Sequence, residues 1–118
     1  MAQLRNLNGE TNTYINKNML VSIVSLATKE IKGVVDVYKS KRLSIKGLFD
    51  KNIGKGVKIK YTNIGALIDI YVIISTDCEV NDVVYRIQQN VINSIKSLLP
   101  IKIKAINVHV MDAEKPSL

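Results

Sequence analysis

The stretch Ala66–Ser75 constrains the fold most, because almost every residue in it is apolar. Its sequence, ALIDIYVIIS, is rich in β-branched side chains, which favour strands. The stretch is far shorter than the roughly 20 residues that a membrane-spanning helix needs. We therefore expect a central strand of a sheet, with both of its faces covered. Asp69 interrupts the apolar run, so it needs a polar partner or a position that faces solvent.

Two other segments repeat apolar residues at the spacing of an α-helix with one buried face. The first helix is expected at about 17–32. The second is expected to begin near Val80, with Asn81 as its N-cap and Pro100 just beyond its end. Because each helix has a single apolar face, each must pack against another element.

Three further segments have the composition of strands. Gly33–Tyr38 is short and apolar, Val57–Tyr61 alternates apolar with cationic residues, and Ile103–Met111 follows the second helix. Asn63–Gly65 is expected to form a turn into the apolar strand. The order of elements predicts an α+β two-layer sandwich, in which two amphipathic helices pack on one face of a small mixed or antiparallel sheet.

The length of 118 residues fits one compact domain. We expect a flexible N-terminal tail at 1–12, a single α+β domain at 13–112 with a basic loop at about 39–56, and a C-terminal tail at 113–118. Residues 1–20 contain no apolar run of the kind found in a secretory signal. A cytoplasmic protein is therefore expected.

Positive charge is concentrated in one segment, residues 39–60, which we call the basic segment. It holds eight basic residues and one acidic residue, Asp50, whereas the rest of the chain holds nine of each, so it accounts for the whole net charge of +7. Such a field attracts phosphates, anionic lipid or an acidic protein surface, although a solvated lysine-rich loop has the same composition. The candidate partner-binding residues are five cations and two apolar anchors: Lys39, Lys41, Arg42, Lys46, Lys51, Leu48 and Phe49.

The chain has few residues suited to catalysis or metal binding. Its single cysteine and single histidine exclude an intrachain disulfide, a cysteine-based zinc site and most histidine-based metal sites. It has neither a glycine-rich phosphate loop nor an H-E-x-x-H motif. We expect His109 to be a structural or surface histidine and Cys78 to be an inert loop cysteine. The acidic residues next to Cys78 are expected to cap the second helix and to complement its macrodipole. No enzymatic activity, cofactor or metal is expected.

Several short motifs follow one another in an order typical of a known family. The most specific are Ile68-Asp-Ile-Tyr-Val-Ile73 and Ile106-Asn-Val-His-Val110, preceded by Glu30-Ile-Lys-Gly-Val34 and Lys55-Gly-Val-Lys-Ile59. In this order the chain resembles the alkaline shock protein family of bacterial envelope stress response proteins, from about residue 14 to residue 111.

The resemblance implies a non-enzymatic cytoplasmic protein of the cell-envelope stress response, without catalytic residues. It also implies action through protein partners, in some cases a partner anchored in the membrane. The connecting loop is often glycine-rich in this family and is lysine-rich here.

Three binding functions remain open for the basic segment. The one we favour is a protein-interaction or scaffolding module, with self-association through strand edges as one form of it. Non-specific nucleic-acid binding is the alternative, although the sequence shows no exposed aromatic platform for bases. Peripheral contact with an anionic membrane surface would be weak without a lipid anchor.

Overall fold

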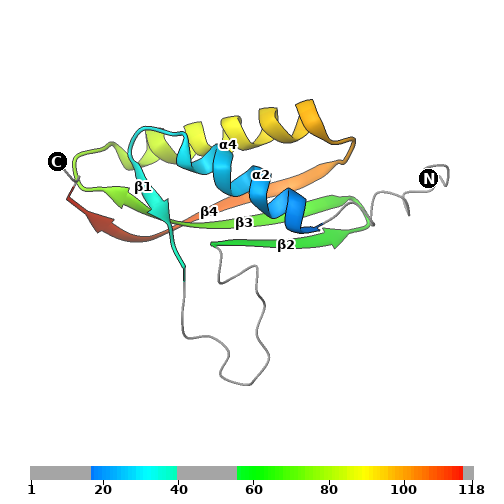
Figure 1. Cartoon of the computed structure of the whole chain (residues 1–118), viewed down its shortest axis with the longest axis horizontal. Helices are drawn as coiled ribbons and strands as arrows, with labels where there is room; N and C mark the ends of the chain where they lie inside the picture. The colour runs from blue at the N-terminus through cyan, green and yellow to red at the C-terminus, as the bar shows by residue number, and fades with distance from the viewer. Residues whose placement is uncertain (1–16, 40–55, 116–118) are drawn as a thin grey trace, which may run out of the picture.

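The computed structural model describes residues 17–39 and 56–115, and in this part of the chain two helices cover one face of a four-stranded sheet (Figure 1). This arrangement confirms the predicted α+β two-layer sandwich. None of the described helices is both long and apolar enough to span a membrane. The elements follow the chain as α2 (Lys17–Lys29), β1 (Val34–Val37), β2 (Val57–Thr62), β3 (Gly65–Ser75), α4 (Val80–Leu98) and β4 (Ile103–Glu114).

Strand β3 is the centre of the sheet, because each of the other described strands pairs with it. β1 and β2 pair with β3 antiparallel, and β4 pairs with it in parallel along nearly its whole length, so the sheet is mixed. Parallel neighbours need a crossover connection, and α4 supplies it between β3 and β4. A two-residue turn joins β2 to β3, and the Thr62 hydroxyl closes it by donating to the Gly65 carbonyl at 2.7 Å.

Strands β1 and β2 occupy successive parts of the same edge of β3. β2 pairs with residues 65–70 of β3 and β1 with residues 72–74. Between the two, the Tyr38 N–H donates to the Tyr71 carbonyl at 2.7 Å, and the Tyr71 N–H donates to the Gly56 carbonyl at 2.8 Å. The chain therefore leaves this edge after Tyr38 and returns to it at Gly56. Without that excursion, β1 and β2 would form one continuous edge strand.

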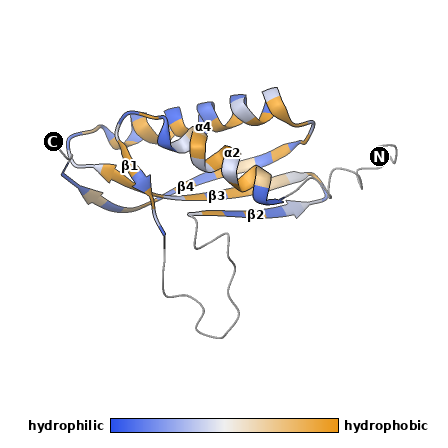
Figure 2. Ribbon diagram, viewed as in Figure 1, coloured by the Kyte–Doolittle hydropathy of each residue, from blue (hydrophilic) through white to orange (hydrophobic). Residues whose placement is uncertain are grey.

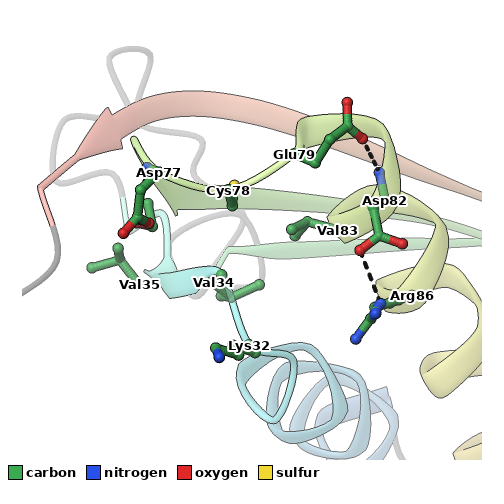
Figure 3. A pocket seen from close by; sticks show the side chains of 11 residues that line it. Lys32, Val34, Val35, Asp77, Cys78, Glu79, Asp82, Val83 and Arg86 are labelled. Carbon is green, nitrogen blue, oxygen red and sulfur yellow. Dashed lines mark hydrogen bonds and ion pairs between the residues drawn. The ribbon is translucent and has the colours of Figure 1, made fainter.

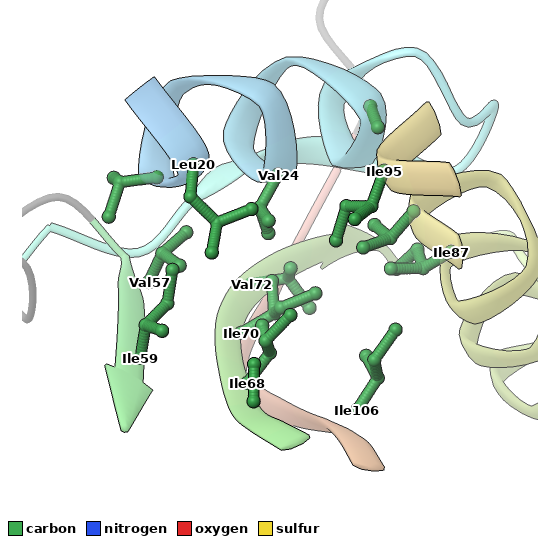
Figure 4. Close-up of a cluster of buried hydrophobic side chains, with 14 of the residues drawn as sticks. Leu20, Val24, Val57, Ile59, Ile68, Ile70, Val72, Ile87, Ile95 and Ile106 are labelled. Atoms are coloured by element: carbon green, nitrogen blue, oxygen red, sulfur yellow. The ribbon is translucent and has the colours of Figure 1, made fainter. Parts of the chain in front are cut away.

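The hydrophobic core lies between the helices and the sheet face that they cover (Figures 2 and 4). Alternate residues of β3 point into it, as a strand requires. The side chains of β3 and the helices that are buried there include Ala66, Ile68, Ile70, Val72, Ile74, Leu20, Val24, Ile87, Val91 and Ile95. The helices pack together as well, and the Asn90 amide of α4 donates to the Ala27 carbonyl of α2 at 2.7 Å.

The opposite face of the sheet, which we call the open face, is not covered by either helix. Burial alternates along β3, and Leu67, Asp69, Tyr71 and Ile73 are only half-buried. The expectation that both faces of this strand are covered is therefore wrong, although its central position is confirmed. Leu67 and Ile73 are therefore apolar residues with partial solvent exposure on a face that neither of the two described helices covers.

Three element ends differ from those expected by two residues or more. α2 ends at Lys29, short of 32. The N-cap of α4 is Glu79 and not Asn81, because the Glu79 carboxylate accepts a hydrogen bond from the Asp82 N–H at 3.0 Å. β4 continues to Glu114, three residues beyond the expected Met111, since its pairing with β3 extends that far.

Ile70→Asp should unfold the domain. The Ile70 side chain is fully buried at the centre of the core, and an unpaired charge there costs several kcal/mol, which is comparable to the whole stability of a small domain. Ile64→Asp is the matched control, because Ile64 lies in the β2–β3 turn and is 62% exposed. Circular dichroism during heating should show a cooperative transition for the control alone; a cooperative, near-wild-type transition for Ile70→Asp would contradict this placement of the core.

Candidate functional site

Four polar or aromatic side chains gather at the centre of the open face. Asp69 and Tyr71 come from β3, Asn107 and His109 come from β4, and the parallel register pairs Asp69 with Asn107 and Tyr71 with His109. Residues two apart on a strand share a face, so the two adjacent pairs form one patch. We call these four residues the open-face cluster.

Asp69 organises the open-face cluster. One of its carboxylate oxygens, Oδ1, lies 2.9 Å from His109 Nε2 and accepts a hydrogen bond from Asn107 Nδ2 at 3.2 Å. The Tyr71 ring stacks on the imidazole, with 4.6 Å between ring centroids and 13° between ring planes. Asp69 thus has polar partners and also faces solvent, as its position in an apolar run requires. The His109 ring is fixed by a hydrogen bond and by a stacking contact.

Tyr71 is kept in its neutral form by its surroundings. Burial raises the pKa of its hydroxyl above the ordinary value of 10.0, and the negative charge of Asp69 raises this pKa further. A tyrosine hydroxyl is a neutral donor and acceptor at physiological pH, and the raised pKa extends this neutral range to higher pH.

Charged side chains border the open-face cluster on two sides. Lys58 and Lys60 are exposed residues of β2 that alternate with buried ones, and they pair with Asp69 and Leu67 of β3. At the other end of the face, Asp36 of β1 and Asp112 of β4 both pair with Ile73 of β3. The face is therefore cationic at the β2 end and anionic at the β1 end.

The chemistry of the open-face cluster suits recognition of a polar surface. An Asp–His pair can orient a general base, but in the described part of the chain no hydroxyl or thiol hydrogen-bonds to His109. The same described ranges bring together no group of three His, Cys, Asp or Glu side chains that could hold a metal ion. The rings, the amide and the carboxylate offer stacking and hydrogen bonding at fixed positions.

A pocket of about 630 Å³ lies elsewhere, where the turn after α2 meets the end of β3 and the start of α4 (Figure 3). Its acidic side chains and Arg86 are engaged with their neighbours. Arg86 pairs with Asp82 at 3.1 Å, Glu79 caps α4, and the Ser75 hydroxyl donates to Asp77. Cys78 is half-buried and packs against the core. These contacts fit the expected capping role of the acidic residues at this helix start.

The structure places few of the partner-binding residues expected from the sequence. Lys39 is exposed and directly follows Tyr38, at the point where the chain leaves the edge of β3. The other six lie outside the described residues: Lys41, Arg42, Lys46, Leu48, Phe49 and Lys51. The two remaining lysines of the basic segment that are described, Lys58 and Lys60, lie on the open face.

Sequence reasoning missed the open-face cluster as a unit, although its signal was present. The motifs Ile68-Asp-Ile-Tyr71 and Asn107-Val-His109 each place polar or aromatic residues two apart, which puts them on one face of a strand. Only the parallel pairing of β3 with β4 brings the two motifs together. His109, expected to be structural or on the surface, forms part of this cluster with its side chain 42% exposed.

The sequence matches the profile of the alkaline shock protein 23 family, described as having a cell envelope-related function, over residues 5–114. The uncharacterized protein YqhY of Bacillus subtilis is 27% identical over 90 residues, which are 75% of this chain and 67% of YqhY. The uncharacterized protein Spy1614 of Streptococcus pyogenes is 27% identical over 103 residues, which cover 83% of this chain and 84% of Spy1614.

Solved structures with a similar fold include MamM CTD in its copper form, with a TM-score of 0.57 and 14% sequence identity. That match covers 86% of this chain and 97% of the other. A histidine-to-alanine variant of MamM CTD matches with a TM-score of 0.51 and 11% identity, over 82% of this chain and 98% of the other. At these identities the likeness concerns the fold alone.

The pKa of Tyr71 gives a prediction with a defined sign. Because burial and then Asp69 raise this pKa above 10.0 in the folded state, the folded protein holds the proton more tightly than the unfolded chain. The resulting stabilisation is present in full below the unfolded-state pKa and is lost as the pH rises through the folded-state pKa. Asp69→Asn removes only the second cause, so Tyr71 should ionise at a lower pH than in the wild type, yet still above 10.0.

Tyrosinate absorbance during a base titration measures this change, and subtraction of the Tyr71→Phe titration isolates Tyr71 from the other four tyrosines. Asp82→Asn serves as the control, because Asp82 lies at the start of α4, outside the open-face cluster. An unchanged Tyr71 titration in Asp69→Asn would contradict the electrostatic contact between these two side chains.

Proposed function

The chain belongs to the alkaline shock protein 23 family, whose function is related to the cell envelope, and we propose that it acts there as a non-enzymatic, cytoplasmic module that binds protein partners. The helices and the sheet form a rigid platform, and the basic segment and the open face form the binding surface. The partner is a protein with an acidic surface, and an anchor in the membrane on that partner would hold this chain at the envelope.

One observation carries this proposal: the basic segment is joined to the open face. The chain leaves the sheet after Tyr38 and returns at Gly56, and both residues hydrogen-bond to the backbone of Tyr71 in the open-face cluster. Lys58 and Lys60 then continue the positive charge onto the same face. The basic segment thus begins and ends next to the open-face cluster, whose side chains lie on the opposite face of the sheet from the core.

This arrangement suits protein recognition for two physical reasons. A local excess of positive charge steers an acidic partner toward the face and raises the association rate. The open-face cluster then offers rings and hydrogen-bonding groups that are already fixed by their mutual contacts, so little conformational entropy is lost when a partner binds them.

Non-specific nucleic-acid binding is the second candidate, and the structure adds one observation in its favour. The stacked rings of Tyr71 and His109 lie on an open sheet face near Lys58 and Lys60, and bases stack on aromatic side chains of this kind. Asp69 opposes it, because its carboxylate contacts His109 and repels a phosphate backbone. We therefore favour the protein partner.

A pull-down from nuclease-treated bacterial lysate tests the proposal. The bait variant replaces Lys39, Lys41, Arg42 and Lys46 with Gln. We expect wild-type bait to retain specific proteins and the variant to lose most of them. Thermal stability should be unchanged, because none of the four residues is among those that form the described hydrophobic core.

The control bait replaces Lys29, Lys32, Lys96 and Lys115 with Gln, which removes the same charge from exposed sites outside the basic segment. It should retain the same proteins as the wild type. Equal retention by the variant would contradict a role for the basic segment. If nuclease treatment empties the wild-type sample of every bound protein, nucleic-acid binding replaces the proposal.

A further inference from the structure

We propose that the open face binds a second copy of this chain, with the two sheets stacked face to face about a twofold axis. The inference rests on the proposed function, since it takes the open face as an interaction surface, and it names one partner for that surface. The observation behind it is the charge pattern of the face, which is complementary to itself.

The open face consists of successive rows of side chains across the strands. The first rows carry Lys60 and Lys58, which pair with Leu67 and Asp69. The next row holds Tyr71 and His109, and the last holds Asp36, Ile73 and Asp112. Lys58 and Asp36 therefore lie on opposite sides of the Tyr71 row.

A twofold axis that crosses the strands at the Tyr71 row exchanges these two ends. Because β1 and β2 share one edge of β3, this axis places Lys58 of each copy opposite Asp36 of the other. An isologous interface of this kind forms every contact twice. The dimer thus contains two ion pairs, each between Lys58 of one copy and Asp36 of the other. Within the described part of a single chain, these two residues form no ion pair with each other.

The middle of the face supplies the contacts between these charges. Leu67 and Ile73 are apolar and half-buried, so a second sheet would bury surface that is now partly wet. Stacked sheets pack about 10 Å apart, a gap that lysine and aspartate side chains span together. The Tyr71 and His109 rings lie near the axis and meet their counterparts there.

The size of the face sets the expected affinity. Three strand columns about 4.8 Å apart, with rows about 6.7 Å apart, give roughly 400 Å² per copy. The total for both copies, roughly 800 Å², is below that of a standard specific interface, about 1,200–2,000 Å², and falls in the class of weak, transient contacts. The dimer should therefore be transient, with a dissociation constant in the micromolar range.

Sedimentation velocity at about 100 μM protein, a concentration suited to this affinity, tests the inference with two charge reversals. One variant is Lys58→Glu with Lys60→Glu, and the other is Asp36→Lys with Asp112→Lys. The wild type should dimerise, and each variant alone should dimerise about tenfold or more weakly, because like charges then face each other. An equimolar mixture of the two variants should restore a dimer, since each reversed end then meets its complement.

Lys32→Glu with Lys96→Glu is the control, because it makes the same charge change as the Lys58 and Lys60 variant at exposed sites on the turn after α2 and on α4. It should dimerise like the wild type. A monomeric wild type, unchanged dimerisation in the reversed variants, or no recovery in the mixture would each overturn the inference. If the monomeric wild type still captures proteins through the basic segment, only the dimer is lost and the proposed function stands.

Discussion

The fold depends on the fact that β3 is paired on both edges but covered on one face. Its backbone groups are satisfied by β1 and β2 on one side and by β4 on the other. The alternation of a strand then sends Ile68, Ile70 and Val72 into the core and leaves Asp69 and Tyr71 outside. The helices bury the first set, and their burial supplies the main driving force for folding. The second set is free to carry function.

The same alternation explains how an aspartate can occupy the most apolar segment of the chain. Asp69 lies on the open face, where Asn107 and His109 hydrogen-bond to it. A single parallel pairing, between β3 and β4, thus builds both the central sheet and the open-face cluster. The edge that β1 and β2 share places the basic segment, because the chain leaves this edge after Tyr38 and returns to it at Gly56, both beside Tyr71. The strand β3 therefore positions the hydrophobic core, the open-face cluster and the two ends of the basic segment.

Much of this architecture was predictable from the sequence, because periodicity reports burial. The helical spacing of α4 and the alternation of Val57-Lys-Ile-Lys60 each gave the right element and the right buried face. The apolar run of β3 led to the wrong expectation that both faces of this strand are covered. Leu67 and Ile73 are apolar, although they lie on the open face and are only half-buried. The cap of α4 was missed because Glu79 and Asn81 are both capable acceptors and only geometry selects between them. In the open-face cluster, Asp69 contacts Asn107 and His109, which lie 38 and 40 positions further along the chain. Local sequence patterns cannot predict contacts over such a separation.

The helices cover one face of β3 and leave the other open, and we propose the open face as an interaction surface. NMR of isotope-labelled leucine and isoleucine methyl groups, with a soluble paramagnetic probe in the solvent, tests this arrangement most directly. In dilute protein we expect strong relaxation of the Leu67 and Ile73 methyls and little relaxation of the Ile68 and Ile70 methyls, which are fully buried. Relaxation of Leu67 and Ile73 should then fall as the protein concentration rises. Equal protection of all four residues in dilute protein would show that both faces of β3 are covered.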